Sequence, residues 1–431
     1  MWQRIYLQRL KHDLDLWIER GWVTPANAES ILLSAREPAA TRRMPGVLAI
    51  LGAVLIGFAV MSFVAANWAE ISKLAKLIMI FGAMWAAYIA AFLLQKRDHP
   101  ALAQAAVLIG LGLFGAGIML IAQIYHIVTD DPAGVLAWCI AALSTAWLLP
   151  SRPALALGIL LTVVWTYFVV EMPGAVSPHW SFWLPWAAAL VLSLRLSWSP
   201  GLHLSLIAGL IWQAMNAQAI VETYGIVETQ LAIIILLEML AIWLAAVLLS
   251  ERGPRFASIA EAYAIAFAFA IFWIFQTAPS DNEIASSAAG PLVTGLMAVV
   301  VAGLAFLCIA RSKLEARHII GIGALAVLAL LFPVLRSGAG ETIPWLYAAA
   351  FLVLAAWLVS YGTGRGSRFA VNFGFVAFAA EVLYLYFETL GDLLSTALFF
   401  ALGGVLLIAG SIVMERMRRR LVKAASEGDA P

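Results

Sequence analysis

The sequence predicts an all-α protein, a polytopic bundle of about fourteen transmembrane helices preceded by a small cytoplasmic helical hairpin. Composition gives the first indication. Of the 431 residues, 63% are hydrophobic and 12% are charged, and the mean hydropathy is +0.94. A globular domain is about 45–50% apolar and about 25% charged. The recurrence of long apolar runs and the alternating placement of basic residues are the other two indications. Together they exclude a soluble enzyme, a disordered chain and a nucleic-acid-binding surface.

Residues 1–45 are charged and amphipathic, unlike a signal peptide, in which an apolar stretch follows the first basic residues at once. Gly21 is placed as a helix C-cap, and Thr24 and Pro25 as the N-cap and first position of a second helix. We expect a cytoplasmic helical hairpin lying on the membrane surface, or else a soluble helical pair resting on the transmembrane domain. Apolar residues recur at near-helical spacing at Trp2, Ile5, Leu10, Leu14, Trp17 and Ile18.

A helix needs roughly 20 apolar residues to cross a bilayer core about 30 Å thick. The fourth and fifth such runs are separated only by residues 149–152, so this pair either crosses the membrane fully or forms a re-entrant hairpin. Both arrangements return the chain to the same side of the membrane, so the sidedness of the later loops is unchanged. The bundle spans 46–414, and a basic then polar cytoplasmic tail follows at 415–431. The predicted spans are 46–66, 75–95, 101–123, 133–149, 153–170, 182–197, 202–221, 229–250, 256–276, 290–310, 317–335, 343–361, 368–387 and 393–414.

The basic residues segregate between alternate segments. With a cytoplasmic N-terminus, 23 of the 26 Lys and Arg residues fall in inner segments, and only Lys73, Lys76 and Arg336 fall in outer loops. Because cytoplasmic loops carry an excess of Lys and Arg, this asymmetry predicts that both termini are cytoplasmic. The outer loops are acidic, which indicates either a surface that attracts cations or simply solvated loops.

Three sequence patterns that in other proteins indicate ligand, metal or cofactor binding have a structural explanation here. The string Gly110-x-Gly112-x-x-Gly115 lies inside an apolar run without a preceding strand, so close helix packing explains it better than nucleotide binding. The buried-type residues Cys139 and Cys308 form no metal-binding pattern, and we expect no metal and no cofactor. Tryptophans near span ends are assigned to an aromatic belt, namely Trp68, Trp138, Trp147, Trp180, Trp183, Trp198 and Trp345.

Ionisable residues inside spans are rare and carry a functional expectation. They are Glu238, Glu261 and Glu381, and Glu261 lies close enough to the inner end of its span for its side chain to reach the interface. Glu238 and Glu381 fall in the outer halves of their spans, and we expect each to face protein or water or to be held neutral. They are the candidates for a proton or cation coupling site, and Gln213, Asn216 and Tyr384 are possible hydrogen-bond partners. A candidate outer polar cluster lines either an outward-open cavity or interhelical hydrogen bonds, and its members are Asn67, Gln123, Tyr125, His126, Gln213 and Asn216.

Several motifs resemble a known family. Ala65-Ala66-Asn67-Trp68 closes the first span, Gln123-Ile124-Tyr125-His126 closes the third, and Trp17-Ile18-Glu19-Arg20-Gly21 lies upstream. Over about residues 10–150 this resembles the bacterial predicted membrane proteins grouped as domain of unknown function 2157. The resemblance implies a bacterial inner (cytoplasmic) membrane protein and supplies no activity.

Three functions fit these features. The first is a transporter or flippase-like protein for a small or lipid-linked solute. The second is a membrane-embedded enzyme acting on an envelope or lipid-linked substrate at the outer face, with His126, Asp130 and Asp131 as acid or base candidates, although an enzyme is the less favoured class. The third is a non-catalytic scaffold or sensor. A seven-plus-seven division of the spans would give halves of opposite orientation, as in transporters with inverted repeats, but no internal sequence repeat is evident. The expected partners are the lipid bilayer and an unknown small or lipid-linked solute, and no nucleic acid is expected.

The charge asymmetry makes a topological prediction. Reporter fusions at Asp131 and Asp281 should report an extracytoplasmic location, and a fusion at the C-terminus should report a cytoplasmic one. Losing or adding a span would invert every later loop. A cytoplasmic signal at either of the two loop sites would therefore contradict the predicted topology.

Overall fold

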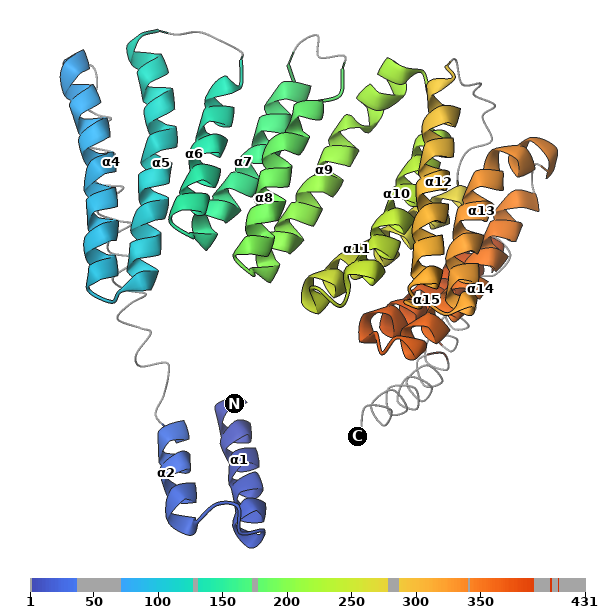
Figure 1. Cartoon of the computed structure of the whole chain (residues 1–431), viewed down its shortest axis with the longest axis horizontal. Helices are drawn as coiled ribbons and strands as arrows, with labels where there is room; N and C mark the ends of the chain where they lie inside the picture. Colours follow the sequence, from blue (N-terminus) through green and yellow to red (C-terminus); the bar gives the residue numbers. More distant parts are fainter. Residues whose placement is uncertain are drawn as a thin grey trace. The chain divides into compact units, whose positions relative to one another are not determined.

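A computed structural model describes residues 2–36, 71–126, 131–172, 177–277, 287–339 and 342–390, together with Gly404 and Gly410. The chain divides into two compact units, Met1–Met79 and Ile80–Pro431, and each is described by itself. The described residues form fourteen α-helices and one short 3-10 helix (Figure 1). This confirms the all-helical fold class.

The first unit contains a pair of helices, α1 (Trp2–Glu19) and α2 (Pro25–Arg36). Gly21, at φ 72°, turns the chain after α1, a backbone conformation that glycine adopts without strain. The Thr24 hydroxyl accepts the Asn27 amide at 3.4 Å, as an N-cap does. Leu14 of α1 and Ala28 of α2 are buried. The helices occur in the segments where the sequence predicts them, and their place at the membrane stays a prediction.

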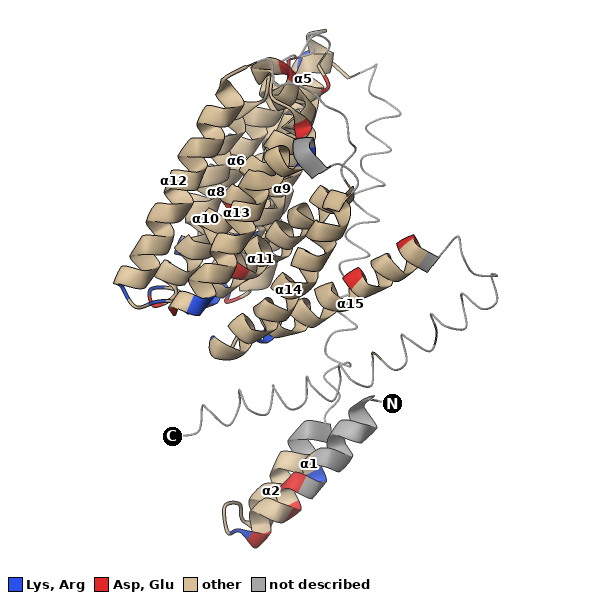
Figure 2. Cartoon of the chain, turned by 90° about the vertical axis from the view of Figure 1, so that its right-hand side faces the viewer, with Lys and Arg blue, Asp and Glu red and all other residues tan. Residues whose placement is uncertain are grey.

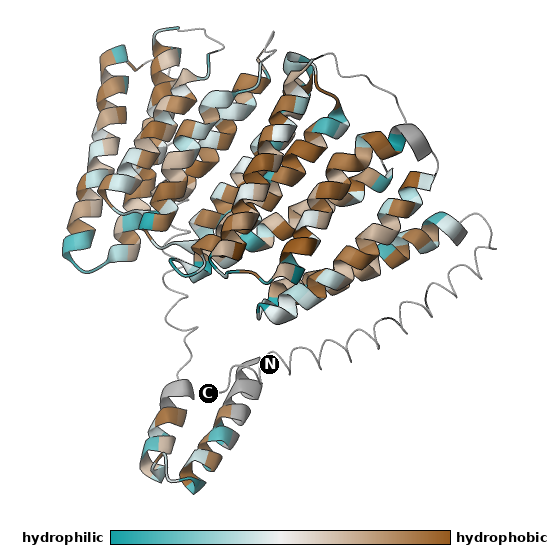
Figure 3. Cartoon of the chain, turned by 45° about the vertical axis from the view of Figure 1, so that its right-hand side comes forward, coloured by the Kyte–Doolittle hydropathy of each residue, from teal (hydrophilic) through white to brown (hydrophobic). Residues whose placement is uncertain are grey.

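Among the described residues from 71 onward, ten helices are long and apolar enough to cross a membrane. Two further helices, α6 with 16 residues and α8 with 13, are shorter. Figure 3 shows hydrophobic residues along the length of these helices. Their bounds are α4 (Lys73–Lys96), α5 (Pro100–Ile124), α6 (Ala133–Leu148), α7 (Arg152–Val170), α8 (Trp183–Arg195), α9 (Ser199–Tyr224), α10 (Glu228–Leu249), α11 (Pro254–Thr277), α12 (Ala289–Ala310), α13 (Ala316–Ala339), α14 (Ile343–Gly364) and α15 (Arg368–Leu390), with the 3-10 helix η1 (Trp180–Phe182) before α8.

These twelve helices coincide to within a few residues with the second to thirteenth predicted spans. The predicted spans 46–66 and 393–414 and the tail at 415–431 lie outside the described residues, apart from Gly404 and Gly410. A chain with this many apolar helices is a multi-pass membrane protein. The segment left open as a re-entrant hairpin is a pair of regular helices, α6 and α7, and the Ser151 hydroxyl caps α7 by accepting the Ala154 amide at 3.3 Å.

Buried residues form two separate hydrophobic cores. One is built on α4–α9 with η1 and includes Leu111, Leu155, Phe182 and Trp212. The other is built on α10–α15 and includes Trp243. We call α5–α9 the first helix group and α10–α15 the second helix group. The boundary between the cores lies between α9 and α10, where a seven-plus-seven division of the predicted spans would also fall.

Successive helices run in alternate directions (Figure 1), so their connections gather at two ends. One end, here called the basic end, is blue where α12 meets α13 in Figure 2. The opposite end has the loops that follow α5, α7, α9, α11 and α13. The described basic residues at the basic end are Lys96, Arg97, Arg152, Arg195, Arg252, Arg255, Arg311, Lys313, Arg317, Arg365 and Arg368.

Glycine permits close approach between α5 and α6. A Cβ added at Gly115 would lie 2.3 Å from the Trp138 ring, whereas one added at Gly112 would meet nothing within 4 Å. All three glycines of the nucleotide-like string lie inside α5. The string is therefore helical, as expected, and Trp138 packs between helices instead of serving only as a belt residue.

This contrast predicts opposite effects of one substitution at two positions. Gly115→Ala should destabilise the protein by about 1–3 kcal/mol relative to Gly112→Ala, because a methyl group at Gly115 overpacks against Trp138. Gly112→Ala is the matched control and should be neutral or stabilising by up to about 1 kcal/mol. Unfolding followed in detergent micelles measures both. Equal stabilities of the two variants would contradict the packing.

Candidate functional site

A carboxyl–amide pair joins the two helix groups. Gln213 of α9 donates its Nε2–H to Oε2 of Glu238 of α10 at 2.6 Å. Both residues are partly buried. The sequence predicts Gln213 as one possible partner of Glu238, and the structure brings the two together.

The pair lies in the wall of a cavity of about 490 Å³ bounded by both helix groups. Aromatic side chains line one part of it, and apolar side chains of α10 and α12 line the rest. No Lys or Arg is among the lining residues that the structure describes. The lining residues are Trp180, Trp183, Trp212, Gln213, Ile220, Tyr224, Ile226, Leu231, Ile234, Ile235, Glu238, Ala289, Gly290, Val293 and Met297.

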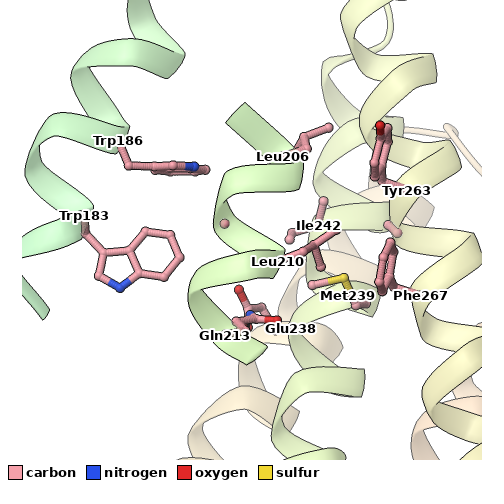
Figure 4. A pocket seen from close by; sticks show the side chains of 12 residues that line it. Trp183, Trp186, Leu206, Leu210, Gln213, Glu238, Met239, Ile242, Tyr263 and Phe267 are labelled. Carbon is pink, nitrogen blue, oxygen red and sulfur yellow. The ribbon is translucent and has the colours of Figure 1, made fainter. Parts of the chain in front are cut away.

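A second cavity of about 80 Å³ lies on the basic side of the same pair. Figure 4 shows Trp183 and Trp186 of α8 on one side of α9, and Tyr263 and Phe267 of α11 on the other. Gln213 and Glu238 line both cavities, together with Trp183. The carboxyl–amide pair is therefore the polar feature that the two cavities share.

The aromatic rings of the larger cavity are fixed by hydrogen bonds at their edges. Trp180 donates its Nε1–H to the Tyr224 hydroxyl at 3.0 Å, and Trp212 donates to the His179 carbonyl at 2.8 Å. Trp212 also contacts the rings of Trp180 and Trp183, with centroids 5.1 and 4.8 Å away. Because the Trp180 and Trp212 N–H groups are used within the protein, these two rings have only their carbon surfaces left for a ligand.

The loop before η1 is held on α9 by both backbone groups of one residue. The His179 amide donates to Asn216 Oδ1 at 2.8 Å, and its carbonyl accepts from Trp212. Asn216 is fully buried and also donates to the Trp212 carbonyl at 2.9 Å. Asn216, a predicted member of the polar cluster, thus positions the aromatic wall and does not itself line the cavity. His179 was missed because nothing in its sequence context distinguishes it from a loop residue.

The His179 imidazole is buried against Trp165, and its Nδ1 lies 3.1 Å from the Thr166 hydroxyl. The Thr166 hydroxyl donates its single proton to the Thr162 carbonyl. Toward His179 it can therefore act only as an acceptor, so Nδ1 of His179 carries the proton and donates it. Nε2 is buried without a partner among the described residues. Burial lowers the pKa of His179 below its ordinary value of 6.5. The neutral imidazole is therefore the form that fits this loop.

The other described residues of the predicted polar cluster do not line this cavity. Gln123, Tyr125 and His126 are exposed at the end of α5, and His126 has a left-handed backbone with φ 53°. Asn67 lies outside the described residues, as does Asp130. The five described residues of the predicted outer cluster thus lie in two separate places, the exposed end of α5 and the α9–α10 boundary, and the place of Asn67 stays a prediction.

Glu381 of α15 is fully buried and has its own partners. Trp273 and Gln276 of α11 both donate to its Oε2 at 3.0 Å. Its Oε1 and the Gln276 Oε1 are buried without a hydrogen-bond partner among the described residues. Glu238 and Glu381 thus share no hydrogen-bond partner in the described chain, and each is held separately by a glutamine amide.

Near the basic end, a third carboxyl is more buried than the sequence suggested. Glu261 of α11 accepts from the Tyr361 hydroxyl at 2.5 Å, and Tyr361 accepts in turn from Trp243 at 2.8 Å. The Arg365 guanidinium lies 3.8 Å from the Glu261 carboxylate. The sequence position of Glu261, near the inner end of its span, suggested a side chain within reach of the interface. The structure instead shows it in a buried network within the second helix group.

A family model described as "Predicted membrane protein (DUF2157)" matches residues 15–155. The match confirms the family resemblance over the part of the chain that carried the motifs. No curated protein and no solved structure matches the chain. The class that the fold and the match define is a multi-pass integral membrane protein, and the cavity at Glu238 lies beyond the matched segment.

The neutral His179 gives the site a pH dependence. Since its pKa in the folded protein lies below 6.5, the unfolded chain takes up the proton first as the pH falls. Stability should then decrease as the pH falls below about 6.5, until the lowered pKa is passed. Unfolding measured between pH 7.5 and about 5 should show a smaller decrease for His179→Gln than for the wild type. Identical pH profiles would contradict the assignment of a buried neutral imidazole.

Proposed function

We propose that the protein is a transporter or flippase-like protein for a small or lipid-linked solute, and that the cavity of about 490 Å³ is its binding site. One observation supports this most strongly. A carboxyl–amide pair forms part of the wall of a cavity located where two separately packed helix groups meet. Ionisable groups within a bilayer are costly and tend to mark functional places, so a carboxyl at this boundary supports a role beyond packing.

The packing supports relative movement of the two groups. Each has its own continuous core, and α9 supplies the main contacts of the first group with α10 and α11. Many transporters alternate access by rocking one bundle against another around a central site. The Gln213–Glu238 hydrogen bond joins the groups at the place where such a movement would open or close the cavity.

Glu238 and Glu381 are the proposed proton or cation coupling residues. Glu238 lines the cavity, so a bound cation would contact it directly. Glu381 has no access to that cavity in the described structure, and its Oε1 lacks a partner. A buried carboxyl with an unpaired oxygen is suited to hold a proton, in a step of the transport cycle separate from ligand binding at Glu238. The two residues therefore serve as separate sites in this proposal.

We further propose a bacterial inner-membrane location with both termini in the cytoplasm. The described basic residues at the basic end support this orientation. The cavity then opens on the outer half of the membrane, because it lies near the α9–α10 connection at the opposite end.

A scaffold or sensor function is the second candidate. It is favoured by exposed apolar side chains on the N-terminal helix pair, including Trp17 at 38% and Trp22 at 67% exposure. Such a surface suits a partner helix or the lipid interface. The enzyme proposal has less support, because His126 is exposed at a helix end and the Asp131 carboxylate accepts the Ala133 amide at 2.9 Å.

Alternating access distinguishes transport from scaffolding. Ile234 lines the cavity, and the natural cysteines Cys139 and Cys308 are fully buried. Ile234→Cys should react with a membrane-impermeant maleimide in right-side-out vesicles and, more slowly, in inverted vesicles. Val353→Cys, on the exposed surface of α14, is the lipid-facing control and should react in neither. Labelling of Ile234→Cys from one side only, or from neither side, would contradict the transport proposal.

A further inference from the structure

We propose that the larger cavity binds an ammonium group, so that the ligand is an organic cation such as a quaternary amine. This inference rests on the proposed function in that it names the ligand class of the same cavity. The observation behind it is the combination of four aromatic side chains with one carboxyl and no basic residue among the described lining residues.

The aromatic side chains form a connected wall. Trp180, Trp183, Trp212 and Tyr224 all line the cavity, and their rings contact one another in series. Ring faces attract cations through the aromatic quadrupole, most strongly for tryptophan, and aromatic cages are a common means of holding quaternary ammonium groups. Because the Trp180 and Trp212 indole N–H groups are already used by Tyr224 and by the His179 carbonyl, neither ring has a hydrogen bond to offer an anion.

The Glu238 carboxyl of the wall, when ionised, supplies the negative charge that a cation requires. Gln213 donates to Oε2 of Glu238, and Oε1 of Glu238 accepts no hydrogen bond from the described residues. An entering ammonium group can therefore pair with Oε1 without breaking the bond to Gln213. An anionic ligand would meet this carboxyl with no Lys or Arg among the described lining residues to compensate it, at the cost of an unpaired buried charge.

A metal cation fits the same wall poorly. Magnesium and calcium bind sets of oxygen ligands, and the described lining offers the Glu238 carboxylate, the Gln213 amide and the Tyr224 hydroxyl among apolar side chains. A volume of about 490 Å³ is instead within the range for a small organic ligand. Size, aromatic content and charge thus favour the same ligand class.

The direct test compares two ligands of the same shape. Purified full-length protein in a maltoside detergent should bind radiolabelled choline saturably. Its uncharged isostere, 3,3-dimethylbutan-1-ol, should displace choline at least about tenfold more weakly than unlabelled choline does. Equal displacement by the two ligands would overturn the proposal, and this comparison needs no variant.

Matched variants locate the binding. Glu238→Gln and Trp183→Leu should each weaken choline binding at least about tenfold. Glu222→Gln is the control for the carboxyl, because Glu222 accepts from Gln218 at 2.6 Å on α9 but is exposed and does not line the cavity. Trp345→Leu, at an exposed position of α14, is the control for the tryptophan. Unchanged affinity in both cavity variants would place any choline site elsewhere and overturn the assignment.

An ammonium group can come from a free solute or from a lipid headgroup. A short-chain phosphatidylcholine tested as competitor separates the sources: stronger displacement than by choline supports a lipid headgroup, and weaker displacement supports a free cation.

If neither compound binds saturably, the ammonium proposal is wrong. In that case labelling of Ile234→Cys from both sides would still support transport of another solute, whereas choline binding with one-sided labelling would support a binding site without transport.

Discussion

The hydrocarbon core of a lipid bilayer offers no hydrogen-bond partner to a side chain, and this constraint bears on where the carboxyls inside the helix bundle lie. Every buried carboxyl of the described spans is matched to a donor from another helix. Glu238 receives the Gln213 amide, Glu381 receives Trp273 and Gln276, and Glu261 receives Tyr361. Each of these bonds joins helices that are not adjacent in sequence or that belong to different groups, so the polar residues determine which helices must stay in register.

Among these carboxyl bonds of the described chain, that of Glu238 alone crosses the boundary between the two cores. Those of Glu261 and Glu381 lie within the second helix group, where apolar packing already holds the helices together. The Gln213–Glu238 bond instead connects α9 with α10, beside cavities that packing leaves unfilled. The same constraint therefore has two consequences. Within a group it adds specificity to a packed core, and at the boundary it leaves a polar pair in reach of a ligand.

The sequence predicted the helices well because the length of an apolar run and the sign of its flanking charges are local properties. Glu238 was also recognised locally, as a carboxyl inside an apolar span. The assembly of the site depends on contacts between helices, which periodicity does not contain. Trp183 resembled a belt residue and proved to line a cavity, whereas His126 resembled a site residue and proved to be exposed at a helix end. His179 and its contact with Asn216 had no sequence signal, because 37 positions separate the two residues.

The central claim is that the Gln213–Glu238 bond couples the two helix groups, and a double-mutant cycle tests it most directly. Gln213→Leu, Glu238→Leu and the double variant would be unfolded in a mixed-detergent titration alongside the wild type. Hydrogen bonds between membrane helices contribute about 0.6 kcal/mol on average, and a bond to a partly buried carboxyl should exceed this. A coupling energy of at least about 1 kcal/mol is predicted. Additivity of the single substitutions within about 0.3–0.5 kcal/mol would contradict the account.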